Sequence, residues 1–201
     1  SSLMSKLTSN QIAALTTAQI KAMSTDQVKG LTTAQAANLT QDQIKTLSTA
    51  QLDAMDTVDL AAVSTDAIAG LTATQVKSMS TANIKALTSD QISRIGTAQV
   101  ALLSAEQAQA IETVDLAAMT TAQIRALSAR NIAALEASSQ IANLTSQQVA
   151  ALTTAQVKSL TDEQVTKMSS DQISAMSTAQ VQVLSSSQLS AMDNADLAAM
   201  T

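Results

Sequence analysis

The chain is 201 residues long and 46% hydrophobic, yet it contains no Phe, Trp, Tyr, Pro, His or Cys. This apolar content argues against a disordered chain, and the core must consist of Leu, Ile, Val, Met and Ala. A formal net charge of −5 argues against nucleic-acid binding, and the lack of Cys excludes disulfides and thiolate metal sites.

From Leu7 onward the chain repeats an eight-residue phrase, of which Leu15–Ala22 (LTTAQIKA) is representative. We label its positions a to h, so that Leu15 is a and Ala22 is h. Position a is always Leu, Met, Ile or Val, f is apolar, b is mostly Ser or Thr, and e is Gln in 18 of 24 octads. The octads run from residue 7 to residue 199, and we predict that residues 1–201 form a single repeat array.

The eight-residue period does not fit one continuous helix. Eight residues advance an α-helix about 80° beyond two full turns, so the apolar stripe would wind around the helix. A strand would place a and f on opposite faces of a sheet, which makes strand the weaker alternative. The Ser or Thr at b and the Gln three residues later match a capping box, and the apolar a and f match a hydrophobic staple. The pattern therefore predicts one helix of about six residues per octad.

Helices of this length are unstable alone, so neighbouring octads must stack. We predict an all-α fold, an α-solenoid of very short helices, one per octad, in the form of an elongated rod. Position d alternates between polar residues and Ala in the first six octads, from Asn10 to Ala50, which favours two octads per coil over three. Neither end shows a polar capping repeat, so either the chain is a fragment of a longer array or the units stack by self-association end to end.

Three octads along the chain carry acids at both capping positions, b and e. Acids in the first turn of a helix suit its dipole, and we favour this interpretation. The alternative is a weak calcium site, because Ca²⁺ takes six to eight oxygen ligands that neighbouring coils could bring together. The candidate ligands are Asp56, Asp59, Glu112, Asp115, Asp193 and Asp196.

Residues 135–143 (LEASSQIAN) form the one repeat of nine residues, where we expect a kink, a joint or another exception. Position c is most often Thr and should face solvent, so ice binding is a minor possibility, although Gln41 and Ala73 interrupt the row. The serines have no His or Cys to activate them, so we expect neither enzymatic activity nor a cofactor. No apolar run is long enough to predict insertion into a membrane.

The phrase L-[ST]-x-x-Q-[IV]-x-[AS] resembles the tandem LTTAQ arrays of very large repetitive surface or secreted proteins of Gram-negative bacteria, over essentially the whole chain. This resemblance implies an extracellular, extended, adhesive or scaffold role, and it carries over no site residues. We therefore expect an extracellular structural protein that forms a rod-like stalk or a filament. The alternative is an adhesin-type binding module that recognises a protein, a glycan or a surface.

Overall fold

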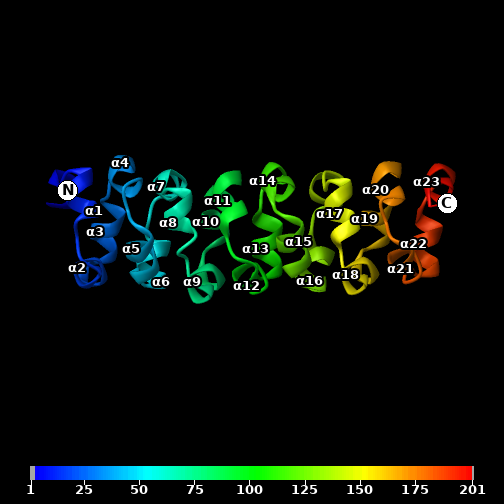
Figure 1. The fold of residues 1–201 in the computed structure, drawn as a ribbon, viewed down its shortest axis with the longest axis horizontal. Coiled ribbons are helices and arrows are strands. Elements are labelled where there is room, and N and C mark those ends of the chain that lie inside the picture. The colour runs from blue at the N-terminus through cyan, green and yellow to red at the C-terminus, as the bar shows by residue number, and fades with distance from the viewer. Residues whose placement is uncertain (1–2, 201) are drawn as a thin grey trace. The chain divides into compact units, whose positions relative to one another are not determined.

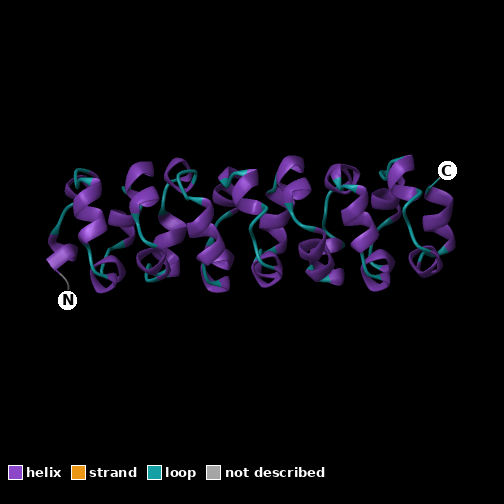
Figure 2. Ribbon diagram, turned by 90° about the horizontal axis from the view of Figure 1, so that it is seen from below, coloured by secondary structure: helices purple, strands orange, loops and turns teal. Residues whose placement is uncertain are grey.

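The structure, a computed structural model, describes residues 3–200. This part of the chain folds into 23 α-helices, one 3-10 helix and one π-helical turn, with short connections and no strand (Figure 2). No helix in residues 3–200 combines the length and the apolar character that crossing a membrane requires. The all-α prediction, with one very short helix per octad, is therefore confirmed.

The chain divides into two compact units, Ser1–Leu102 and Leu103–Thr201, and the octads run through both sequences. The described elements of the first unit are η1 (Leu3–Lys6), α1 (Ser9–Ala13), α2 (Thr17–Ala22), α3 (Thr25–Lys29), α4 (Thr33–Ala36), α5 (Gln41–Thr46), α6 (Thr49–Asp53), α7 (Thr57–Ala62), α8 (Thr65–Ile68), α9 (Ala73–Ser78), α10 (Thr81–Ala86), α11 (Ser89–Arg94) and α12 (Thr97–Val100). Those of the second are α13 (Ala105–Ala110), α14 (Thr113–Ala118), α15 (Thr121–Ala126), α16 (Ala129–Ala134), η2 (Ala137–Ile141), α17 (Ser146–Ala151), α18 (Thr154–Ser159), α19 (Asp162–Thr166), α20 (Ser170–Ser174), α21 (Thr178–Val181), α22 (Ser186–Ala191) and α23 (Asn194–Ala199).

The helices begin where the capping boxes predict. Thr16 has an extended backbone, with φ −69° and ψ 158°, and its hydroxyl accepts a hydrogen bond from the Gln19 backbone N–H at 3.2 Å. The Gln19 Oε1 accepts in turn from the Thr16 backbone N–H at 2.8 Å. The same box opens most of the helices, and because each cap is extended, the preceding helix ends there without Pro.

Each coil contains three helices in both units. In the first unit α1 packs against α4, α4 against α7, and α7 against α10, and the two other columns of helices follow the same rule (Figure 1). In the second unit every helix likewise packs against the third element after it, with η2 counted as one element. The preference for two octads per coil is therefore wrong. Position d is exposed in the first six octads, whether it is polar or Ala. Its alternation therefore does not determine how many helices form one coil.

The core consists of the side chains at f, with those at a around them. Ile12, Ile44 and Ile68, all at f, are fully buried, and the a residues Leu39 and Leu71 are 3% and 2% exposed. A helix of about six residues gains its stability from this burial, because nucleation of an isolated turn is unfavourable.

The nine-residue repeat forms a π-helical turn, η2. The Ile141 backbone N–H donates to the Glu136 carbonyl, and Ala142 donates to Ala137, so both bonds span five residues. The extra residue is thus absorbed within one turn, and η2 still packs against α14 and α19. The predicted irregularity is local, and it leaves the order of packing in the second unit unchanged.

Candidate functional site

The glutamine at position e links one coil to the coil before it. In α6, the Gln51 Oε1 accepts from the backbone N–H of Ser48, which caps its own helix. Its Nε2 donates to the carbonyls of Ile20 at 3.0 Å and Met23 at 2.7 Å, 31 and 28 residues earlier, at the C-terminal end of α2. The last carbonyls of a helix lack partners within the helix, so this amide satisfies two of them.

The same bridge recurs along both units and forms a ladder of buried amides. Each glutamine reaches the end of the fourth helix before its own, with one carbonyl at f and one at the following a. The bridging residues are Gln35, Gln43, Gln51, Gln75 and Gln91 in the first unit, and Gln140, Gln148, Gln156, Gln164, Gln172, Gln180 and Gln188 in the second. All twelve are at most 4% exposed, which makes this the principal polar structure inside the fold.

The ladder continues through the nine-residue repeat. Gln140 keeps both roles, since its Oε1 accepts from Glu136 N–H and its Nε2 donates to the Ile111 carbonyl at 2.7 Å. Bridges that span the insertion, such as that of Gln156, reach back 32 and 29 residues instead of 31 and 28. The π-turn therefore preserves the register of the bridges.

The acids at e replace the amide with a different contact. In α7 the Asp59 Oδ1 accepts from the Thr33 hydroxyl at 2.7 Å, and in α23 the Asp196 Oδ1 accepts from Ser170 at 3.0 Å. Both hydroxyls lie 26 residues earlier, at position c. Asp59 is only 6% exposed, so this bond satisfies a carboxylate that faces the preceding coil. An aspartate has no N–H to offer to the carbonyls of Val28 and Leu31, the pair that a glutamine would bind there.

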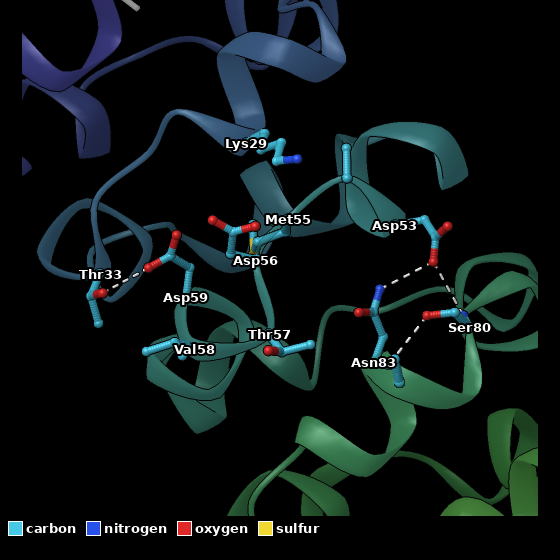
Figure 3. A pocket seen from close by; sticks show the side chains of 12 residues that line it. Lys29, Thr33, Asp53, Met55, Asp56, Thr57, Val58, Asp59, Ser80 and Asn83 are labelled. Carbon is cyan, nitrogen blue, oxygen red and sulfur yellow. Dashed lines mark hydrogen bonds between the residues drawn. The ribbon is translucent and has the colours of Figure 1, made fainter. Parts of the chain in front are cut away.

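A recess of about 720 Å³ opens beside Asp59 in the first unit (Figure 3). Lys29 and Thr33 line it from the preceding coil, and Asp56, Thr57 and Val58 line it from the start of α7. Val58 is 68% exposed, an unusual value for a large apolar side chain in this protein.

The far wall of the recess is a small polar network. The Asp53 Oδ1 accepts from the Asn83 Nδ2 at 3.2 Å and from the Ser80 backbone N–H at 3.3 Å (Figure 3). Asn83 replaces the glutamine of its octad, and its shorter side chain donates to the side chain of Asp53, the last residue of α6, in place of the backbone carbonyls that a glutamine binds. The recess therefore lies where two successive helices of one column, α7 and α10, both lack the standard amide.

The six calcium candidates do not gather into a metal site. Asp56 and Asp59 line the recess together, but within residues 3–200 no group of three or more acidic side chains is placed to hold a metal ion. Asp193 caps α23 through the Asp196 backbone N–H, whereas Asp56 and Glu112 make no side-chain cap bond. Asp115 is buried like Asp59. Both interpretations of these acids, as charges that suit the helix dipole and as calcium ligands, therefore stay predictions.

An acid also occupies the first turn of α13. Glu106 is fully exposed, and its pKa is lowered first by a hydrogen bond from its own backbone N–H and then by the Ser104 hydroxyl. Both donors belong to the helix start, where free N–H groups favour negative charge.

Position c faces outward at some helices, as expected for N1, whereas Thr49 and Thr65 at this position are half-buried. Thr33, Thr57 and Thr81, which open three stacked helices of the first unit, are all exposed. This row is the feature on which the ice-binding possibility depends, and that possibility stays a prediction.

The sequence revealed one of the two roles of the glutamine. The capping box follows from a spacing of three residues, but the bridge connects positions 28 and 31 residues apart, which local pattern rules do not address. The available signal was the strong preference for Gln over Glu at e, because both cap equally well and only Gln donates.

The family comparison agrees with this periodic structure. The family described as the ALTTAQ repeat matches residues 4–41, 52–89, 108–146, 141–178 and 165–201, and its last two matches begin one coil apart. Comparison with curated proteins and with solved structures finds no match. Because its matches cover most of the sequence, and because the octads resemble LTTAQ arrays throughout, the chain belongs to the ALTTAQ repeat family.

Proposed function

We propose that this chain is an extracellular structural repeat segment, which serves as a rod-like stalk or as a subunit of a filament. The observation that carries the proposal is the glutamine ladder. In both units, the glutamine at position e, the most strongly repeated polar side chain, joins each coil to the coil before it. Such a chain is organised to extend a periodic structure, because stability in a solenoid comes from contacts between neighbouring repeats.

Two features of composition are compatible with the extracellular part of the proposal. The chain has no cysteine, so its fold does not depend on the redox state of its surroundings. Its net charge of −5 favours solubility and disfavours adsorption to anionic surfaces. Labelling of intact cells of the source organism with an antibody against the chain tests this part. We expect labelling without permeabilisation, and labelling only after permeabilisation would contradict an extracellular role.

Negative-stain electron microscopy across a concentration series, with and without Ca²⁺, tests the structural role. A filament subunit gives fibres of uniform width, whereas a stalk segment gives discrete rods of uniform length. Irregular particles would contradict both forms. A requirement for Ca²⁺ would support the calcium alternative for the acidic octads.

The recess in the first unit favours a second candidate, a binding module for a protein or a glycan. Polar groups and the exposed side chain of Val58 meet there, and hollows of this kind are typical of ligand sites. A glycan array probed with the wild-type chain and with Val58→Asp tests it. A hit that the variant loses would support binding at the recess, and an array without hits would contradict glycan recognition.

A further inference from the structure

A buried amide oxygen in the recess of the first unit lacks a hydrogen-bond donor. Asn83 on α10 is 2% exposed and lines the recess. Its Nδ2 donates to the Asp53 Oδ1, and because a carboxylate only accepts, this bond fixes which end of the amide is the oxygen. The Oδ1 points away from Asp53, toward the side of the recess on which Thr57 lies (Figure 3). No donor among residues 3–200 reaches this oxygen.

An asparagine at position e in the second unit shows that this oxygen is an exception. The Asn131 Oδ1 accepts from the backbone N–H of Ser128 at 2.9 Å, while its Nδ2 donates to two backbone carbonyls of the coil before it. In α10 the corresponding N–H, that of Ser80, donates to Asp53 instead. Buried acceptors in proteins nearly always have a donor, so the Asn83 oxygen is a place for a donor from a ligand.

The same asparagine leaves a backbone acceptor without a donor. A glutamine at position 83 would donate to the carbonyls of Leu52 and Met55, in the pattern that Gln51 shows. The Leu52 carbonyl still accepts from the Met55 N–H at 3.2 Å, but the Met55 carbonyl receives no hydrogen bond from residues 3–200. Met55 lines the recess, so two acceptors on this side need donors.

Two carboxylates on the other side of the recess lack a cation. Asp59 is 6% exposed, and the Thr33 hydroxyl occupies only its Oδ1, while its second oxygen lies on the side of Asp56 (Figure 3). Asp56 makes no cap bond. Lys29 also lines the recess, but within residues 3–200 neither acid forms an ion pair with it. A buried carboxylate is costly unless a positive charge or several donors compensate it.

We propose that the recess binds an organic cation, namely a primary ammonium or a guanidinium group on an aliphatic stem. Three carboxylates and one ammonium line the recess, so the lining carries a charge of −2. The N–H groups of the ligand would supply the donors that the Asn83 and Met55 oxygens lack, and the exposed side chain of Val58 offers an apolar surface to the stem. This inference deepens the binding-module candidate, because it names the ligand of the same recess.

The lining distinguishes this ligand from a metal ion and from a sugar. Within residues 3–200 no three acidic side chains are placed to hold a metal ion, whereas an ammonium on a stem is larger and brings its own N–H donors. A sugar offers as many acceptors as donors and would leave the negative charge without compensation. The chain also has no aromatic side chain on which a sugar ring could stack.

Two variants test the proposal by restoring the standard glutamine of the repeat. Asp59→Gln removes the buried carboxylate, and Asn83→Gln supplies a donor to the Met55 carbonyl from within the chain. Because both restore the usual bridge, we expect both to fold like the wild type, which circular dichroism and the urea midpoint verify. Asp42→Gln, at an exposed position outside the recess, is the control of equal charge for Asp59→Gln.

Isothermal titration calorimetry with pentylamine, butylguanidine and pentan-1-ol gives the result. Pentan-1-ol has the same stem as pentylamine and carries no charge. We expect at least one of the two cations to bind the wild type at one site with a Kd on the order of 1 mM or lower. Pentan-1-ol should bind at least about tenfold more weakly, and each restored variant should bind the cation at least about tenfold more weakly than the wild type. Asp42→Gln should stay within about twofold of the wild type.

The same cation could come from a free small amine or from a basic side chain of a partner protein. Capped tripeptides with a central lysine or arginine between two glycines distinguish these sources. Binding of a tripeptide at least as tight as that of the free cation would assign the recess to a protein side chain. Binding of the free cation alone would assign it to a small molecule, and either result supports the proposal.

Four outcomes would overturn the proposal: no saturable binding of either cation, equal binding of pentan-1-ol, unchanged binding in both restored variants, or an equal loss in Asp42→Gln. A glycan-array hit without binding of either cation would keep the binding module and replace its ligand. Fibres or uniform rods with labelling of intact cells would support the structural role whatever the recess binds. Failure of this inference is therefore distinguishable from failure of the proposed function.

Discussion

The glutamine side chain at position e has one acceptor oxygen and two donor hydrogens, and the fold uses all three. In α9, the Gln75 Oε1 accepts from Thr72 N–H at 2.7 Å, while its Nε2 donates to the carbonyls of Ile44 and Leu47, both at 2.8 Å. This residue is 3% exposed, so each of these groups depends on the others for its hydrogen bonds.

Gln75→Glu should therefore be strongly destabilising, although glutamate caps helices well. The variant retains the bond to Thr72, but it places a buried carboxylate against two carbonyl oxygens. We expect a loss of about 2–4 kcal/mol in urea unfolding at pH 7. Gln147→Glu, at an exposed position, should change stability by less than about 0.5 kcal/mol. Equal effects would show that the bridge contributes little.

The same variant should show a pH dependence of known sign. The carbonyls favour the protonated form, so folding raises the pKa of the introduced carboxyl above its unfolded value. The penalty is complete above the folded pKa, shrinks as the pH falls through it, and reaches its minimum below the unfolded pKa. Urea titrations at several pH values, with the wild type as reference, measure this trend, and a penalty independent of pH would contradict it.

Gly70 shows how closely the coils approach. A Cβ at this position would lie 2.5 Å from the Gln41 Cγ and 2.8 Å from the Gln41 carbonyl oxygen. Since the backbone cannot move aside easily, we expect Gly70→Ala to cost about 1–3 kcal/mol in thermal or urea unfolding. Gly30→Ala is the matched control, because Gly30 ends α3 with φ −86° and should be neutral or gain up to about 1 kcal/mol. A tolerated Gly70→Ala would mean that the two coils separate readily.

At the scale of the helix, each octad depends on the three-residue spacing between cap and glutamine. The nine-residue repeat satisfies this requirement differently, because the π-turn lets Gln140 reach the Glu136 N–H across four residues at 2.9 Å. The two residues that precede Gln140, Ser138 and Ser139, are exposed. The additional residue therefore does not itself disturb the packing of the core.

Deletion of Ser139 should convert η2 into an ordinary α-helical octad. The remaining residues, LEASQIAN, match the repeat, so we expect a stability within about 1 kcal/mol of the wild type. Deletion of Gln147, an exposed residue at position d of α17, is the matched control. It shortens the spacing between Thr145 and Gln148 and displaces Val149 from the core, so a loss of at least about 3 kcal/mol should follow. Similar urea midpoints for the two deletions would contradict this account.

The local half of the fold was predictable from the sequence, and the half that depends on long-range packing was not. Thr16 and Gln19 reveal a helix start because their bonds span three residues. The choice between two and three helices per coil depends on how α1 meets α4, and position d held no information about it because it is exposed. Likewise, nothing in the octad of Asp59 indicates that its partner is Thr33, 26 residues earlier.

At the scale of the whole chain, the helices α1–α3 and α21–α23 each pack against one neighbouring coil within residues 3–200, whereas α4–α9 and α16–α20 pack against two. Several apolar side chains of α1–α3 and α21–α23 are half-buried. Stability in such an array should therefore fall toward these coils.

Native-state hydrogen exchange should reveal this gradient. We expect amides in α1–α3 to exchange at least about tenfold faster than those in α4–α9, and amides in α21–α23 faster than those in α16–α20, at dilute protein concentration. Mass spectrometry of peptides from each segment measures the difference. Uniform protection within each unit would instead indicate that the unit opens as a whole.

The amide bridges have a genetic consequence, because each bridging glutamine at e binds the carbonyls at the end of the fourth helix before its own, wherever it stands in the array. Every standard octad supplies both one amide and one pair of carbonyls, so unequal recombination that adds or removes whole octads would leave a foldable protein. Asp59 and Asp196 are among the exceptions, since each accepts a hydrogen bond from a hydroxyl 26 residues before it. Alleles of the gene should therefore differ in length by multiples of eight codons, with the fewest changes between Thr33 and Asp59 and between Ser170 and Asp196.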